Sequence, residues 1–219
     1  MACLLYCVSL VPENPVPNLV GIAEQPVVAH ESGGFRVYYS DVASPEALLE
    51  GAARKAADVK FRQVLRELVA FATPLAFLFP SVVDEVGAID VLIAEQRETY
   101  TEALNRLAGM VQLELTATWA VDEQADLATP ISGREYQRRH QEAESRVAAI
   151  DRKLKSVTAG IVREWRSRQE RRTRIWVALL ERGDRERFVA ALRSAGPSEG
   201  VRLKLSGPWP PNEFVSPSV

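Results

Sequence analysis

The chain has 219 residues, of which 47% are hydrophobic and 26% are charged, and its formal net charge is −2. These are the values of an ordinary globular protein, so they exclude a wholly disordered chain, a collagen-like fibre and a disulfide scaffold. The length suffices for one large domain or two small ones, and the net charge alone gives no reason to expect a nucleic-acid or anionic-membrane partner.

The apolar stretches do not have the length of membrane spans. The longest, Ala70 to Pro80, contains two prolines and is far shorter than the roughly 20 residues that a spanning helix needs. The apolar start, Met1 to Val11, has neither a basic beginning nor a small-x-small cleavage site. We therefore expect a cytoplasmic protein without a membrane span, whose first segment is a strand.

The sequence offers little for metal, redox or catalytic chemistry. Cys3 and Cys7 stand four residues apart in the expected first strand, which separates their Cα atoms by about 13 Å, too far for a disulfide. His30 and His140 are far apart in the chain, and no nucleotide-binding or hydrolase motif occurs. We expect no catalytic residue, no cofactor and no metal site, and we expect that the protein is not an enzyme.

Hydrophobic periodicity predicts alternating strands and helices in the first half of the chain. The expected strands are Cys3 to Ser9, Gln25 to Ala29, Phe35 to Tyr39 and Leu75 to Phe79. A helix is expected to begin at Ser44-Pro45-Glu46, an N-cap pattern, and to end at Pro74. A second helix is expected from Asp84 to Ala108, and Gly109 then marks the end of a first domain, residues 1–109.

The second half predicts another small α+β domain, residues 110–219. Strict alternation from Val111 to Trp119 and from Val201 to Leu205 predicts strands. Between them we expect a long helix at about residues 132–172, an apolar run at Ile175 to Leu180 and a short helix from Asp184 to Ser194. The expected order is β-α-β-α-β. A linker at residues 125–133 is the alternative place for the domain boundary.

Charge is segregated along the chain, although the net charge is small. Residues 1–130 carry 8 basic and 18 acidic side chains, residues 131–175 carry 13 and 6, and residues 176–219 carry 6 and 5. The positive excess therefore falls on the expected long helix. Its arginine cluster, Arg163 to Arg174, is consistent either with a solvated helix end or with a binding surface. A nucleic-acid partner is disfavoured because the rest of the chain is acidic and carries no RNA- or DNA-reading motif.

Apolar positions on the same expected helix alternate at spacings of four and three, which is typical of a coiled-coil seam. The seam consists of Tyr136, His140, Ala143, Val147, Ile150, Leu154, Val157 and Ile161. We expect it either to bind a partner helix or to fold back onto a helix of its own chain. His140 is expected to be a packed or register-setting residue rather than a base.

The C-terminal stretch VRLKLSGPWPPNEFV, residues 201–215, combines an alternating strand with a proline-rich turn. It resembles the closing signature of the gas vesicle protein F/L (GvpF/GvpL) family, a strand followed by Gly-Pro-x-Pro-Pro-Tyr-x-Phe. The matching positions are Gly207, Pro208, Trp209, Pro210, Pro211 and Phe214, whereas Asn212 stands where the family usually has Tyr. We interpret this motif as a marker of the fold, because glycine permits a sharp turn and prolines fix an extended path.

The resemblance covers essentially the whole chain and implies a function. It implies two α+β domains, the second ferredoxin-like and extended by a helical coiled coil. It also implies an accessory protein of gas vesicle assembly, which contacts the shell protein and other accessory vesicle proteins during nucleation or early formation. Two other classes remain as alternatives: an adaptor that binds nucleic acid or another partner through the basic helix, and an enzyme of unknown activity.

Overall fold

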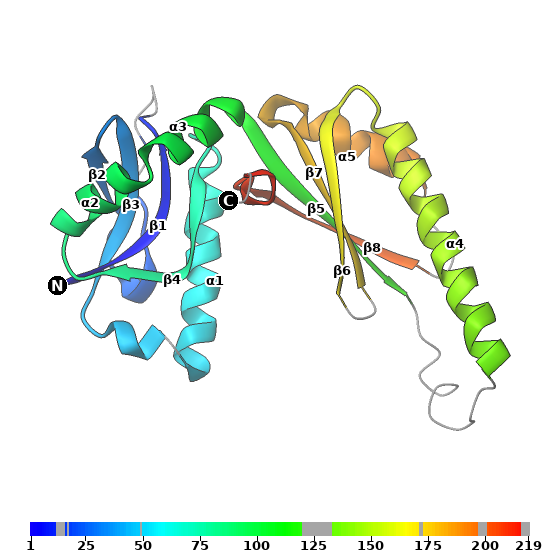
Figure 1. Cartoon of the computed structure of the whole chain (residues 1–219), viewed down its shortest axis with the longest axis horizontal. Coiled ribbons are helices and arrows are strands. Elements are labelled where there is room, and N and C mark those ends of the chain that lie inside the picture. The colour runs from blue at the N-terminus through cyan, green and yellow to red at the C-terminus, as the bar shows by residue number, and fades with distance from the viewer. Residues whose placement is uncertain are drawn as a thin grey trace. The chain divides into compact units, whose positions relative to one another are not determined.

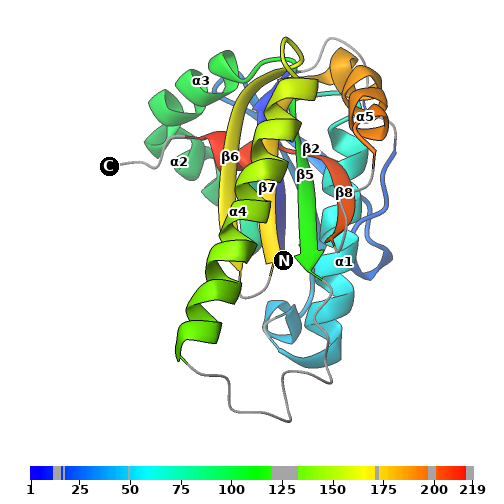
Figure 2. The ribbon, with the colours of Figure 1, turned by 90° about the vertical axis from the view of Figure 1, so that its right-hand side faces the viewer.

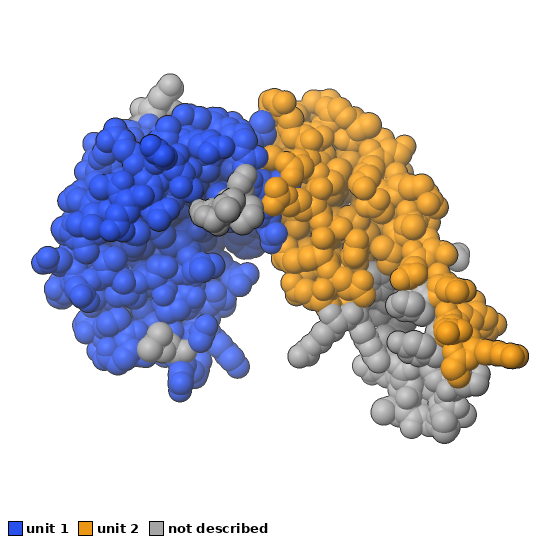
Figure 3. All heavy atoms as spheres, in the orientation of Figure 1, with its two compact units in different colours: residues 1–112, 207–219 blue, residues 113–206 orange. Residues whose placement is uncertain are grey.

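The structure is a computed structural model that describes residues 1–11, 16, 18–48, 50–119, 133–170, 173–196 and 201–215 (Figure 1). The chain divides into two compact units. Unit 1 contains Met1–Gln112 and Gly207–Val219, and unit 2 contains Leu113–Ser206 (Figure 3). Each unit is built on one four-stranded antiparallel sheet with helices, so the predicted α+β class with two domains is confirmed.

The sheet of unit 1 has the strand order β2-β3-β1-β4, and neighbouring strands run antiparallel. The strands are β1 (Ala2–Leu10), β2 (Val28–Ser32), β3 (Phe35–Val42) and β4 (Leu75–Val83). The helices are α1 (Gly51–Leu68), α2 (Gly87–Glu95) and α3 (Arg97–Arg106), and the short 3-10 turns are η1 (Ile22–Glu24) and η2 (Pro45–Leu48). The single helix expected from Asp84 to Ala108 is therefore two helices, which meet at Gln96.

Strand β1 lies between two hydrophobic layers. Every residue from Cys3 to Val8 is buried, as happens when both faces of a sheet are covered. Helix α1 covers one face, where Phe61 stacks on Tyr6 with ring centroids 5.4 Å apart. Helix α3 covers the other face, where Tyr100 meets Phe35 edge-on at 6.2 Å, and the two helices lie on opposite sides of the sheet (Figure 2).

The sheet of unit 2 has the strand order β6-β7-β5-β8. Its elements are β5 (Met110–Trp119), α4 (Gly133–Val157), β6 (Val162–Glu170), β7 (Thr173–Glu181), η3 (Arg182–Asp184), α5 (Arg185–Ser194) and β8 (Val201–Trp209). Its core joins α4 to the sheet through a cluster of buried side chains, Leu115, Ala117, Ile150, Leu154 and Trp176. The first residues of β5 and the last residues of β8 belong to unit 1.

The prediction of a long coiled-coil helix at about residues 132–172 is wrong. Helix α4 ends at Val157, and a turn with Gly160 in the left-handed region (φ +74°) follows it. Glycine adopts this conformation more readily than other residues and commonly follows the end of a helix. The seam spacing continues past this turn to Ile161 by coincidence, because Ile161 lies outside the helix.

Strand β6 was missed, so the order of elements in unit 2 is β-α-β-β-α-β rather than the predicted β-α-β-α-β. The strand has the charge-rich sequence VREWRSRQE and lies at the edge of the sheet, where charged side chains are common. Its one aromatic side chain, Trp165, packs against the core of unit 2 and lies 6.1 Å from the Phe188 ring. Arg163, Arg166 and Arg168, assigned to a helix end, therefore belong to this strand, and Arg174 belongs to its hairpin partner, β7. Arg171 and Arg172 of the same predicted cluster lie outside the described residues.

No helix in the described ranges is long and apolar enough to cross a membrane.

The packing of α4 predicts the effect of truncating Leu154, which is 4% exposed. We expect Leu154→Ala to lower the free energy of unfolding by about 2–4 kcal/mol, because it removes buried methyl groups and leaves a cavity. The matched control is Leu78→Ala, since Leu78 is 88% exposed and its truncation is expected to cost less than about 0.5 kcal/mol. Urea denaturation measures both, and equal losses would contradict the packing described.

Candidate functional site

Residues 207–215, here called the C-terminal segment, return the chain to unit 1. Gly207 lies in β8 with a φ of +110°, a conformation that favours glycine. Pro210 and Pro211 are buried, and Phe214 in the turn η4 (Asn212–Phe214) has no exposed surface. The family motif therefore packs into unit 1 rather than lining an open site.

Asn212 pairs the C-terminal segment with the edge of the first sheet. Its Oδ1 accepts a hydrogen bond from the Ala76 backbone N–H at 2.9 Å, and its Nδ2 donates to the Ala76 carbonyl at 2.6 Å. Ala76 belongs to β4, which is the last strand in the sheet order. A side-chain amide offers the same donor and acceptor as a peptide group, so Asn212 occupies the edge as a neighbouring strand would.

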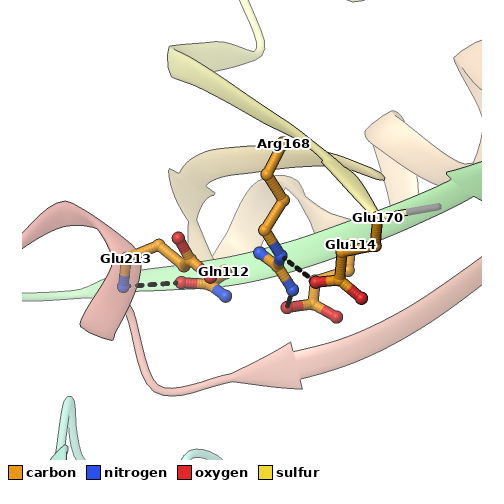
Figure 4. Close-up of polar contacts among 5 residues, drawn as sticks. All are labelled: Gln112, Glu114, Arg168, Glu170 and Glu213. Atoms are coloured by element: carbon orange, nitrogen blue, oxygen red, sulfur yellow. Dashed lines mark hydrogen bonds and ion pairs between the residues drawn. The ribbon is translucent and has the colours of Figure 1, made fainter. Parts of the chain in front are cut away.

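Three other contacts hold the C-terminal segment within unit 1. The guanidinium of Arg66 in α1 lies 4.6 Å from the centroid of the Trp209 ring, a cation–π contact. The guanidinium of Arg106 in α3 donates a hydrogen bond to the Phe214 carbonyl. The Glu213 backbone N–H donates to Gln112 Oε1 at 3.2 Å (Figure 4). Together with Asn212, these contacts attach the segment to α1, β4, α3 and the start of β5.

The seam residues of α4 divide by burial. Ile150 and Leu154 are 6% and 4% exposed and pack against the sheet of their own unit. Val147, Val157 and Ile161 are half-buried. The predicted positions Tyr136, His140 and Ala143 fall on side chains outside the described part of the structure. Of the two alternatives that the sequence left open, packing within the chain therefore holds for Ile150 and Leu154.

The described arginines of β6, and Arg174 of β7, have acidic or polar neighbours. Arg168 contacts Glu170 at 2.9 Å and Glu114 at 3.4 Å (Figure 4). Arg166 lies 3.0 Å from Glu164, Arg163 lies 3.5 Å from Glu181, and Arg174 donates to Ser167 Oγ at 2.8 Å. Exposed ion pairs such as these contribute little to stability, but they offset the positive charge that the sequence placed here.

Burial or hydrogen bonds shift the pKa values of two other groups, the Cys7 thiol and the Asp90 carboxyl. Burial raises the pKa of the Cys7 thiol well above its ordinary value, which leaves it unreactive at neutral pH. Hydrogen bonds from Ser32 and then from His30, whose Nε2 lies 3.0 Å from Oδ1, lower the pKa of the Asp90 carboxyl. Among the described residues, no group of three or more His, Cys, Asp or Glu side chains is placed to hold a metal ion.

Each unit has a sizeable hollow in its described surface. In unit 1, a cavity of about 820 Å³ lies between η1, the end of β3 and α1, with Ile22, Val42 and Ala57 among its lining. In unit 2, a groove of about 490 Å³ lies between α4, α5 and the strands β5 and β8. Lys153 and Arg193 contribute to the lining of this groove.

Sequence reasoning missed the residues that anchor the C-terminal segment and the two cations of the groove. Arg66, Arg106 and Gln112 are distant in the chain from the residues that they contact, and their types are common on any surface. Asn212 alone carried a signal, because it departs from the pattern of the family that the sequence resembles. Periodicity finds the buried face of α4, but it does not indicate which cations lie beside the groove.

These features define a two-unit α+β protein whose C-terminal segment completes the first unit. The chain belongs to the GvpL/GvpF family: the family model "Gas vesicle synthesis protein GvpL/GvpF" matches residues 2–216. The resemblance deduced from the C-terminal motif is thus confirmed.

Two crystal structures are similar to this chain over nearly its full length. The gas vesicle protein GvpF from Microcystis aeruginosa has a TM-score of 0.75 and 16% identity, covering 98% of this chain and 99% of that one. GvpF from Anabaena sp. PCC7120 has a TM-score of 0.76 and 18% identity, covering 100% and 97%. At these identities the likeness establishes a shared fold. A comparison with curated protein sequences gave no significant match.

The paired contacts of Asn212 predict that Asn212→Ala lowers the free energy of unfolding of unit 1 by about 1 kcal/mol, because two hydrogen bonds to an exposed edge are lost. The matched control is Asn105→Ala, since Asn105 is an exposed residue of α3, and we expect it to change stability by less than about 0.5 kcal/mol. Thermal and urea denaturation measure both variants. Indistinguishable results for the two would show that the contacts with Ala76 contribute nothing.

Proposed function

We propose that this chain is an accessory protein of gas vesicle assembly, which binds the shell protein and other vesicle proteins during nucleation or early formation. The match of the GvpL/GvpF family model over residues 2–216 carries this proposal. The likeness in fold to two GvpF proteins supports it. Because no cluster of perturbed titratable groups lines either hollow in the described residues, the proposal includes no enzymatic activity and no cofactor.

The two units suit a protein that holds several components. Each has its own sheet, its own core and its own hollow. We further infer that unit 2 is ferredoxin-like, which is supported by its β-α-β-β-α-β order and by its central pair, β5 and β7, the first and third strands of the unit. Such a scaffold presents side chains from several elements on a rigid frame, which favours binding rather than catalysis.

The proposal predicts that the tagged chain, coexpressed with a gas vesicle shell protein, retains that protein through affinity purification. A variant that ends at Ser206 is expected to retain much less shell protein, because unit 1 loses the segment that completes it. Circular dichroism monitors the fold of both forms. If the complete chain retained neither the shell protein nor another vesicle protein, the proposed function would be wrong.

The alternative of a nucleic-acid adaptor yields a separate prediction. Since Arg163, Arg166, Arg168 and Arg174 have acidic or polar neighbours, we expect the purified chain to pass through a column of immobilised double-stranded DNA or RNA at about 0.15 M salt. Retention that weakens steeply as salt rises would favour the adaptor instead.

A further inference from the structure

The groove of unit 2 lies over part of its hydrophobic core. Its lining comes from both helices and from two strands: Leu115, Ile150, Leu154, Val189, Leu192, Val201, Leu203 and Leu205 are its apolar members. Helices α4 and α5 lie on the same side of the sheet (Figure 2). Leu205 is 36% exposed, so part of the apolar lining remains open to solvent.

Among the described residues that line the groove, the charged side chains are all basic. They are Lys153 of α4 and Arg193 of α5, and both residues are exposed. Neither has an ion-pair partner among the described residues. The arginines of β6 differ, since Arg163, Arg166 and Arg168 each lie within 4 Å of a glutamate oxygen. Two cations that are open to a partner's carboxylates therefore flank the groove.

We propose that this groove binds an amphipathic helix of a partner protein, with apolar side chains against Leu203 and Leu205 and with carboxylates beside Lys153 and Arg193. An apolar groove between two helices suits the apolar face of such a helix. Two unpaired cations beside it select acidic flanks, since carboxylates gain charge-assisted hydrogen bonds there and basic flanks would be repelled. This inference rests on the proposed function, because the partner is taken to be a vesicle protein.

The test places a photo-reactive amino acid at Leu205, beside the groove, in the complete chain coexpressed with the shell protein and the other gas vesicle proteins. A second chain carries it at Val91, which is 59% exposed on α2 in unit 1, as the control position. Mass spectrometry of the cross-linked peptides identifies what lies in the groove.

The charge-reversal variant is Lys153→Glu with Arg193→Glu. Its matched control is Arg146→Glu with Arg185→Glu, two exposed cations of the same helices that do not line the groove.

We expect a cross-link from position 205, absent from position 91, to a vesicle-protein segment with apolar residues at helical spacing and flanking Asp or Glu. Its yield should fall about fivefold or more in the reversal of Lys153 and Arg193, as expected for the loss of two exposed ion pairs and their replacement by repulsion. The control reversal should leave the yield unchanged.

Equal yields in the two reversals, or a cross-link to a second copy of this chain, would overturn the proposal. So would the absence of a cross-link at position 205 when vesicle proteins still copurify, an outcome that would leave the proposed function standing. Failure of every vesicle protein to copurify with the unaltered chain would overturn the proposed function and this inference together.

Discussion

The fold of unit 1 depends on the return of the C-terminal segment to the edge of the first sheet. The backbone groups of an edge strand need partners, and an open edge invites pairing with other chains. Asn212 supplies both a donor and an acceptor to Ala76, and Phe214 becomes completely buried. Because β5 leaves unit 1 and β8 returns to it, the whole of unit 2 is inserted between two segments of the first unit.

Hydrophobic periodicity predicted the strands and helices whose buried residues recur at one regular spacing. The alternation of Val111 to Trp119 became β5, and the helical spacing of Phe61, Leu65 and Leu68 became the buried face of α1. Strand β6 escaped prediction because an edge strand needs few apolar residues, and its arginines resemble the surface of a helix. The anchors of the C-terminal segment escaped because their contacts join residues that are more than 100 positions apart, as Arg106 and Phe214 are.

Helix α4 packs against the sheet of unit 2 and also lines the groove, and its sequence pattern does not distinguish the two roles. The seam positions Ile150 and Leu154 are buried against the sheet, so their spacing reflects the core of unit 2 rather than a coiled coil. The same two residues form one wall of the groove, whose other wall is α5. The spacing of apolar residues thus identifies the buried face of α4. The structure is needed to distinguish the cations beside the groove from the arginines that lie near glutamates.

The most direct test of this account is hydrogen–deuterium exchange on the complete chain and on a chain that ends at Ser206. If the C-terminal segment completes unit 1, its removal should speed amide exchange in β4 and α3, which it contacts, and leave α4 and β7 of unit 2 as protected as before. Unchanged protection in β4 and α3, or a loss of protection confined to unit 2, would contradict the account.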